Sequence, residues 1–253
     1  MKKPYIGITG FVTKEEVAEI LKLMPHSSKR LLMVGVLASW NTMYENKVSG
    51  RYPSIKNISE IFIKHPLTLN LIHYDTTNTD TLCDQLISLT VYGGKNLNGF
   101  QLNITWPPID QLKEYRSVYH NNIIVLVITP QAFEDARRSP RLLLSRIKDY
   151  KGLIDYVLLD RSGGCGISLD TIFMREYLHV LYAKDLGMGF SIAGGLSEDT
   201  LYLIEPLVKE YPGLSFDAED KLRNSYDDSL NLDFAKKYLC RALIISNQVK
   251  QIQ

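Results

Sequence analysis

The sequence lacks the features that mark several specialised classes of protein. Its three cysteines, Cys83, Cys165 and Cys240, share no C-x-x-C spacing. An odd number without that spacing predicts neither a disulfide framework nor a zinc site, and fits a reducing compartment. The first residues contain no apolar run of signal-peptide length, and no stretch reaches membrane-spanning length. We therefore expect a cytoplasmic protein with no membrane partner.

An excess of charge of one sign is also missing. The 29 lysines and arginines nearly balance the 28 acidic residues, which leaves a formal net charge of +1 and no long run of one sign. Proteins that bind nucleic acids or membrane surfaces usually carry a basic patch or run. We predict no nucleic-acid partner. A small molecule remains the expected partner, and self-association into a homo-oligomer is left open.

Neither the dinucleotide turn G-x-G-x-x-G nor the P-loop G-x-x-x-x-G-K-[ST] occurs, which counts against an open doubly wound sheet. Apolar, β-rich runs instead alternate with segments of helical spacing. The eight runs are YIGIT (5–9), LLMVGVL (31–37), LTLNLIHY (67–74), GFQLNI (99–104), IIVLVIT (123–129), YVLLD (156–160), GFSIAGG (189–195) and GLSFDAE (213–219). Eight βα units without a low-complexity linker predict an α/β protein, a (β/α)₈ barrel forming one domain over residues 1–253.

Helix signals follow several of these runs. Thr13 and Glu16 have the spacing of a capping box at the start of a helix. Ser168 is the expected N-cap of a second helix, and Gly187 its stop. A third helix is expected to start at Ser197.

In a barrel, the site is expected at the C-terminal ends of the strands and in the loops that follow them. Asp160 ends the sixth apolar run and precedes a loop that contains Gly163 and Gly164. A carboxyl group there is suited to general acid or base catalysis when burial shifts its pKa. It is equally suited to capping the loop or pairing with Arg161.

Gly194 and Gly195 stand between the seventh run and the helix expected at Ser197. Backbone N–H groups at such a junction bind anions, because glycine allows close approach. The alternative is a tight turn that needs glycine for its conformation. The loops after strands seven and eight of barrels often hold phosphate, so we expect a phosphate site here.

Other candidate groups leave their alternatives open. Asp75, Asp160, Asp217, Glu219 and Asp220 could share a magnesium ion, but we favour the alternative that they are solvated loop carboxylates and helix N-caps. We therefore predict no metal and no cofactor. Cys165 is either a displaced base or an ordinary loop residue. His73 is expected to be a packed strand residue.

The segment ASWNTMYENKVSGRYPS (38–54) is long for a βα connection, and such loops are often lids. Its aromatic residues Trp40, Tyr44 and Tyr52 could stack on a ligand, pack the loop onto the barrel or form a dimer contact.

Several segments together resemble the phosphoribosylanthranilate isomerase family, the barrel enzymes of tryptophan biosynthesis. YIGIT is similar to the end of that family's K-I-C-G-I-T, SGRYPS to K-R-Y-I-S, and FQLN to V-Q-L-H. LLDRSGGCG resembles L-L-D followed by a G-G-S-G loop, and IAGGLSEDT resembles S-G-G-L-x-P-E-N. The matches occur in the same order over nearly the whole chain.

The resemblance implies a metal-free Amadori rearrangement of N-(5′-phosphoribosyl)anthranilate. It implies that Asp160 is the general acid and that Arg51 holds the anthranilate carboxylate. The family's strand-one cysteine, its general base, corresponds to Ile6, and an isoleucine cannot accept a proton. The remaining positions implied to bind substrate are Asn103, Gly163, Gly164, Gly194, Gly195 and Asp217.

Two departures accompany the one at Ile6. Asn103 stands where the family has a histidine, and Glu219 and Asp220 replace a phosphate-binding Ser-Gly after the eighth strand. We therefore expect an isomerase-like protein that acts on or binds a small phosphorylated or carboxylated metabolite. The alternative is a non-catalytic barrel used for ligand sensing or protein association.

Overall fold

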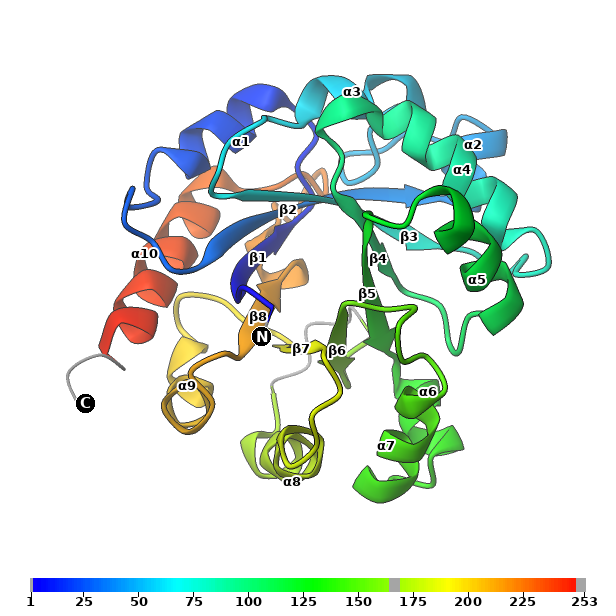
Figure 1. Cartoon of the computed structure of the whole chain (residues 1–253). Helices are drawn as coiled ribbons and strands as arrows, with labels where there is room; N and C mark the ends of the chain where they lie inside the picture. The colour runs from blue at the N-terminus through cyan, green and yellow to red at the C-terminus, as the bar shows by residue number, and fades with distance from the viewer. Residues whose placement is uncertain (1, 164–168, 249–253) are drawn as a thin grey trace.

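The computed structural model of the chain, which describes residues 2–163 and 169–248, is a closed barrel of parallel strands surrounded by helices (Figure 1). Each strand pairs with the next in sequence, and β8 pairs with β1. The strands are β1 Tyr5–Thr9, β2 Leu31–Ser39, β3 Thr68–Asp75, β4 Gly99–Leu102, β5 Ile123–Ile128, β6 Tyr156–Asp160, β7 Gly189–Ala193 and β8 Ser215–Ala218. The predicted (β/α)₈ barrel and its eight strands are confirmed.

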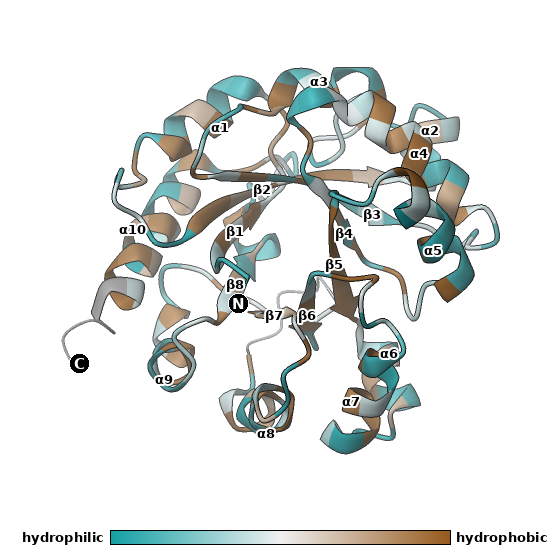
Figure 2. Ribbon diagram, in the orientation of Figure 1, coloured by the Kyte–Doolittle hydropathy of each residue, from teal (hydrophilic) through white to brown (hydrophobic). Residues whose placement is uncertain are grey.

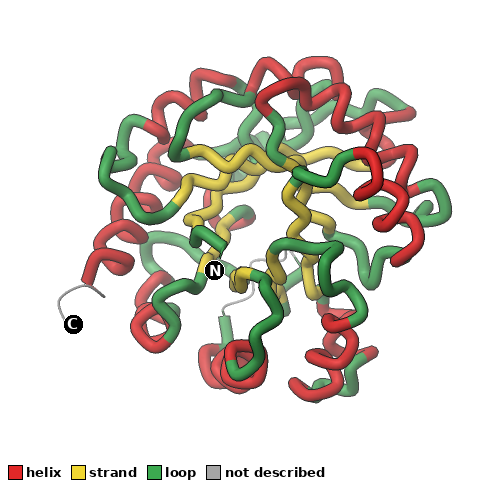
Figure 3. Tube along the Cα trace, in the orientation of Figure 1, coloured by secondary structure: helices red, strands yellow, loops and turns green. Residues whose placement is uncertain are grey.

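Helices form the outer ring of the molecule (Figure 3). The α-helices are α1 Lys14–Leu21, α2 Trp40–Tyr44, α3 Ile58–Ile61, α4 Leu82–Gly93, α5 Ile109–Val118, α6 Pro130–Asp135, α7 Pro140–Lys148, α8 Thr171–Tyr182, α9 Glu205–Glu210 and α10 Leu232–Gln248. Short 3₁₀ helices are η1 Ile55–Asn57, η2 Gly94–Asn96, η3 Leu201–Leu203 and η4 Asp220–Leu222. Among the described residues, no helix has the length and apolar character needed to cross a membrane.

Two hydrophobic cores follow from the alternation of side chains along each strand. The outer core lies between the strands and the helices, whose hydrophobic residues alternate with hydrophilic ones in Figure 2. The inner core fills the barrel and consists of Tyr5, Met33, Leu69, Leu71, Val125, Val127, Tyr156 and Leu158. Because the inner core is apolar at its centre, a site can form only at the ends of the barrel.

The direction of the side chains on β1 changes the interpretation of Ile6. Ile6 is fully buried in the outer core and pairs with Leu32 and Phe216, which belong to the same core. Gly7 has the opposite orientation, because a Cβ atom there would contact the inward-facing side chain of Asp217. A catalytic group at position 6 would therefore point toward the helices and away from the mouth of the barrel. Ile6 does not occupy a base position in this fold.

The helix signals were only partly informative. The capping box of Thr13 and Glu16 is present at the start of α1. The N-cap of α8 is Asp170, whose side chain accepts a hydrogen bond from the Phe173 N–H, so the prediction of Ser168 as N-cap was wrong. Ser168 itself lies outside the described residues.

The helix expected from Ser197 was also misplaced. The segment 201–203 forms the 3₁₀ helix η3, and α9 begins at Glu205 with Pro206 in its first turn. Proline disfavours a helical conformation in the residue before it and lacks a backbone N–H, so it favours a helix start at this point over a helix interior. The end of α9 at Glu210, shortly before Pro212, agrees with the sequence.

Candidate active site

A pocket opens at the C-terminal ends of the strands, at the mouth of the barrel. Val127 and Leu158 of the inner core contribute to its lining, with polar residues from β1, β3, β4, β6 and β8 around them. The cavity measures about 40 Å³, and the free space reaches about 460 Å³ when the open mouth is included. The cavity therefore admits a few water-sized groups, with the remainder of a ligand in the open mouth.

Asp217 on β8 is the most deeply buried charged residue in this lining, with 4% of its surface exposed. Its Oδ2 accepts a hydrogen bond of 2.8 Å from Gln101 Nε2, while its Oδ1 has no partner within the described part of the chain. Burial raises the pKa of Asp217 to about 8; the negative charges of Glu219 and Asp160 act in the same direction, and the Gln101 hydrogen bond acts against it. Asp217 is therefore mainly protonated at neutral pH.

Two glycines in the strands make room for this arrangement. A Cβ atom on Gly7 would lie 1.9 Å from Asp217 Oδ1, and one on Gly35 would lie 2.3 Å from Thr9 Oγ1. The inward-facing positions of β1 and β2 therefore hold glycine because the neighbouring polar side chains occupy the space. These contacts explain why the apolar first strand contains a glycine two residues before its polar end, Thr9.

Four polar atoms of the pocket lining are buried without a hydrogen-bond partner in the described residues. They are Thr9 Oγ1, His73 Nδ1, Gln101 Oε1 and Asp217 Oδ1. More than about nine in ten buried polar atoms are normally satisfied, so four exceptions in one lining call for an explanation. A ligand or ordered water in the cavity would provide the missing partners.

Asp160 lies at the end of β6 and lines the same pocket. Its Oδ1 accepts hydrogen bonds from the Ser162 N–H at 2.8 Å and the Ser162 hydroxyl at 2.6 Å. It therefore caps its own loop and also faces the pocket. Arg161 pairs instead with Asp170 at 3.1 Å and stacks over the Phe173 ring, so the predicted alternative of an Asp160–Arg161 pair does not form.

Gly194 and Gly195 line the pocket after β7 with left-handed φ angles of 131° and 57°. The turn therefore requires glycine for its conformation, as the predicted alternative of a tight turn stated. Their two amides donate no hydrogen bond within the described chain, although Gly194 is buried. The turn thus also leaves two N–H groups available to a ligand, as the predicted anion site requires.

The predicted glycine loop after Asp160 is described only in part. Gly163 has a φ of 57° and is exposed. Gly164 and Cys165 lie outside the described residues.

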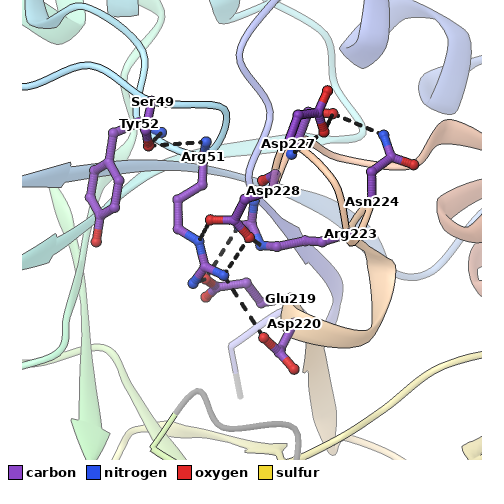
Figure 4. Close-up of polar contacts among 10 residues, drawn as sticks. Ser49, Arg51, Tyr52, Glu219, Asp220, Arg223, Asn224, Asp227 and Asp228 are labelled. Atoms are coloured by element: carbon purple, nitrogen blue, oxygen red, sulfur yellow. Dashed lines mark hydrogen bonds and ion pairs between the residues drawn. The ribbon is translucent and has the colours of Figure 1, made fainter.

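Arg51 lies in the loop after β2, where its guanidinium contacts carboxylates that follow β8 (Figure 4). Its Nε and Nη2 donate to the two oxygens of Asp228 at 2.6 and 2.7 Å, and its Nη1 donates to Glu219 at 3.3 Å. These contacts, the Asp228 hydrogen bonds first, raise the pKa of Arg51. Arg51 does not contribute to the pocket lining described above. A ligand carboxylate would compete for Arg51 with the carboxylates of Asp228 and Glu219.

Arg223 completes this cluster of charges. Only 3% of its side chain is exposed, its Nη2 donates to Glu219 at 3.2 Å, and its Nη1 donates to the Asp228 carbonyl at 2.9 Å. Glu219 therefore faces two guanidinium groups, which reduces the repulsion that its charge would exert on an anion in the mouth. Lys221, which also lines the pocket, adds a positive charge there.

The remaining predicted position, Asn103, follows β4 and is half-buried. Its N–H donates to the Tyr74 carbonyl at 2.9 Å, and it does not belong to the pocket lining. Gln101, two residues earlier, is the residue of β4 that lines the pocket. The sequence interpretation missed Gln101 and regarded His73 as packing, although both are polar residues at alternating positions of apolar strands.

The carboxylates considered for magnesium do not form a cation site. Asp75 is absent from the pocket lining that holds the other four. Within the described residues, no three His, Cys, Asp or Glu side chains converge as a metal site requires.

The fold and the position of the pocket define a TIM barrel of the kind found in many enzymes. Orotidine 5′-monophosphate decarboxylase from Methanocaldococcus jannaschii is similar in structure, with a TM-score of 0.52 and 12% identity over 93% of this chain and 97% of that one. The aldolase QR15 has a TM-score of 0.53 and 9% identity over 96% of both chains. No protein-family model and no curated protein matches the sequence. At this identity the similarity shows a shared fold alone.

Proposed function

We propose that the mouth of the barrel binds a small anionic metabolite and catalyses a proton-transfer reaction on it, an isomerisation or a lyase reaction, with Asp160 as an acid/base residue. The observation that carries this proposal is the set of buried polar atoms without partners, contributed by β1, β3, β4 and β8 to one pocket. A structure that only needed stability would favour apolar or mutually paired side chains there. Unpaired groups converging on a pocket are typical of binding and catalytic sites.

The preference for an anion rests on the rim of the pocket. Gly194 and Gly195 present two N–H groups, and Lys221 supplies a positive charge. Glu219 is paired with Arg51 and Arg223, so its charge is largely compensated. A phosphate or carboxylate group would lie against the glycine turn, and the rest of the molecule would extend toward Asp160 and Asp217.

A reaction like that of phosphoribosylanthranilate isomerase is the specific form of this proposal. It rests on the ordered sequence resemblance and on the place of Asp160 beside the pocket. Since Ile6 faces the helices, the absence of a cysteine there does not decide whether such a reaction takes place. The proton acceptor would instead be an inward-facing residue such as Asp160.

Two measurements on the full chain test the proposal. The first is turnover of N-(5′-phosphoribosyl)anthranilate, followed by loss of its fluorescence, and the second is calorimetric titration with inorganic phosphate. Asp160→Asn should abolish turnover and leave phosphate binding in place, because Asp160 is assigned to the reaction. Asp199→Asn, an exposed carboxylate in the segment after β7, is the matched control and should change neither.

The outcomes separate the two functional classes. Turnover lost in Asp160→Asn supports the isomerase form. Phosphate binding without turnover supports the ligand-binding alternative and removes the specific reaction. A wild type that neither binds phosphate nor turns over the substrate contradicts the proposal.

A further inference from the structure

Asp217 and Gln101 form a buried pair that is joined by one hydrogen bond and leaves one polar atom of each side chain unused. Gln101 Nε2 donates to Asp217 Oδ2 at 2.8 Å, while Gln101 Oε1 and Asp217 Oδ1 have no partner among residues 2–163 and 169–248. The amide thus fixes one oxygen of the carboxyl group and leaves the other free. Neither residue has a cation as partner in the described chain, and both line the enclosed cavity.

The immediate surroundings of Asp217 Oδ1 are a glycine and an apolar side chain. Oδ1 occupies the place where any side chain at position 7 would lie, since a Cβ on Gly7 would come within 1.9 Å of it. Met33 Cε lies next to the same position, at 2.8 Å from that Cβ. Glycine and an apolar neighbour on this side of Asp217 therefore supply no side-chain donor to Oδ1. A carboxyl oxygen in such surroundings favours the protonated form, which donates a hydrogen bond.

We propose that Asp217 is the proton-donating residue of this site, that Gln101 is its positioning residue, and that the ligand is a sugar phosphate that presents a carbonyl or ring oxygen to Asp217. This inference rests on the proposed function for the presence of a ligand at the mouth. The two carboxyl groups of the pocket then have different partners and different roles. Asp160 Oδ1 accepts two hydrogen bonds from Ser162, as a carboxylate does, whereas Asp217 carries a proton.

The proposed proton transfers balance without a cofactor. The Asp160 carboxylate accepts the proton of the carbon next to the ligand carbonyl, and the C–H electron pair becomes a carbon–carbon double bond. The Asp217 O–H gives its proton to the carbonyl oxygen, which forms an enediol. In the second half, Asp160 returns its proton to the neighbouring carbon, and Asp217 regains a proton from the other hydroxyl. The product is the isomeric carbonyl compound, and both carboxyl groups return to their initial states.

The size of the pocket agrees with this class of ligand. The cavity of about 40 Å³ has room for a carbonyl group and its neighbouring atoms, and the open mouth lies beside the glycine turn that we assign to the phosphate. A ligand with an oxygen acceptor at one end and a phosphate at the other therefore spans the observed features. Inorganic phosphate alone would occupy only the outer part.

The first test is a carbon-13 NMR titration of aspartate carboxyl groups in the ligand-free protein. The titratable groups that face Asp217 are Glu219 after β8, Asp160 on β6, Tyr5 on β1 and Tyr238 on α10; His73 on β3 lines the same pocket. We expect one carboxyl resonance with a midpoint near the Asp217 pKa of about 8, absent from Asp217→Asn. If every aspartate resonance titrates in its usual acidic range, the inference is overturned.

Gln101→Met tests the positioning role, because it removes the donor and keeps a side chain of similar length. Since the Gln101 hydrogen bond lowers the pKa of Asp217, its loss should move the midpoint upward. An unchanged midpoint would overturn the assignment of Gln101, because a purely structural role would not act on this resonance.

The second test compares calorimetric binding of D-ribose 5-phosphate and inorganic phosphate at neutral pH. Asp217→Leu, which removes both the donor and the acceptor, should weaken ribose 5-phosphate binding about tenfold, the usual effect of removing a buried hydrogen-bond partner, and leave inorganic phosphate binding unchanged. Equal affinity of both proteins for ribose 5-phosphate would overturn the inference and leave the proposed function standing. If neither probe binds the wild type although the carboxyl titration has the expected midpoint near 8, the proposed function is contradicted instead.

Discussion

The carboxylates near the mouth of the barrel differ in their partners: some are paired with arginine, and Asp217 is not. Asp228 and Glu219 each contact arginine, and Arg51 and Arg223 are in turn surrounded by carboxylate and carbonyl oxygens. Asp217 has no cation as partner among the described residues, and its side-chain hydrogen-bond donor is the Gln101 amide. Charge pairing thus joins the loops after β2 and β8, whereas the Asp217 carboxyl group is buried without a counterion in the described residues, which favours its neutral form.

The largest expected effect of this contrast is on the pH dependence of the unfolding free energy, through the unpaired carboxyl group of Asp217. In the folded chain Asp217 keeps its proton up to a pKa of about 8, whereas the unfolded chain releases it near the ordinary value of 3.8. Between these values the folded state binds more protons, so stability falls as pH rises; the contribution is complete below about pH 4 and lost above about pH 8. A shift of about four pKa units corresponds to about 5 kcal/mol.

Urea unfolding of wild type and Asp217→Asn at intervals from pH 4 to pH 9 measures this effect. The difference in unfolding free energy between the two proteins should change by about 5 kcal/mol over the range, with the variant gaining relative stability at high pH. Asp199→Asn should follow the wild type throughout. A constant difference between wild type and Asp217→Asn would show that Asp217 ionises normally.

Gly7→Ala should disturb the unpaired carboxyl group directly. The new Cβ would lie 1.9 Å from Asp217 Oδ1, so the side chain or the strand must shift. Overpacking of this kind typically costs about 1–3 kcal/mol. Gly213→Ala is the matched control, because its Cβ would meet only Tyr182 Oη, at an ordinary 3.9 Å. Equal unfolding free energies for the two alanine variants would contradict the described packing.

Arg51→Met tests the paired group of carboxylates. Loss of the two-point contact with Asp228 should destabilise the chain by about 1 kcal/mol, because the pair is partly exposed, and the loss should shrink at high salt. Arg175→Met breaks the more exposed contact with Glu210 and is expected to cost less. A larger effect for Arg175 would argue against a special role of the Arg51 cluster. Thermal or urea unfolding at low and high salt provides the comparison.

The smallest expected effect concerns position 6. Ile6→Cys should leave the new thiol buried under the helices and unreactive toward a thiol reagent in the folded state, because Ile6 belongs to the outer core. Thr9→Cys places a thiol in the pocket lining and should react faster. Rapid labelling of Ile6→Cys would show that position 6 faces the mouth, as the family resemblance implies.

The sequence was sufficient for the fold because each strand is a short apolar run bounded by polar residues. The expected and observed limits of the first and sixth strands coincide at Tyr5–Thr9 and Tyr156–Asp160. The sequence could not show which side of a strand faces inward, since in β1 both sides consist of small or apolar residues. That ambiguity allowed Ile6 to be matched with a catalytic position, although Gly7 and Thr9 are the inward residues.

The sequence indicated the candidate site less completely, because it does not show which residues the closed barrel brings together. Asp160, Asp217 and the Gly194–Gly195 turn end their strands and could be found as polar ends of apolar runs. Gln101 lies within a strand, so only the closed barrel shows that it reaches Asp217 on β8. The position of Arg51 depends on contacts with residues after β8, 168 and 177 positions away in the sequence, which no local pattern reveals.

The most direct test of the account is an infrared difference spectrum of wild type minus Asp217→Asn in the ligand-free chain, recorded from acidic to alkaline pH. A protonated carboxyl group has a C=O band that a carboxylate lacks. We expect the wild type to show this band at neutral pH and to lose it around pH 8, with the pKa of Asp217, and we expect the variant to lack it throughout. A spectrum that shows only the carboxylate bands of Asp217 at neutral pH would contradict the claim that the barrel keeps this group neutral for a ligand.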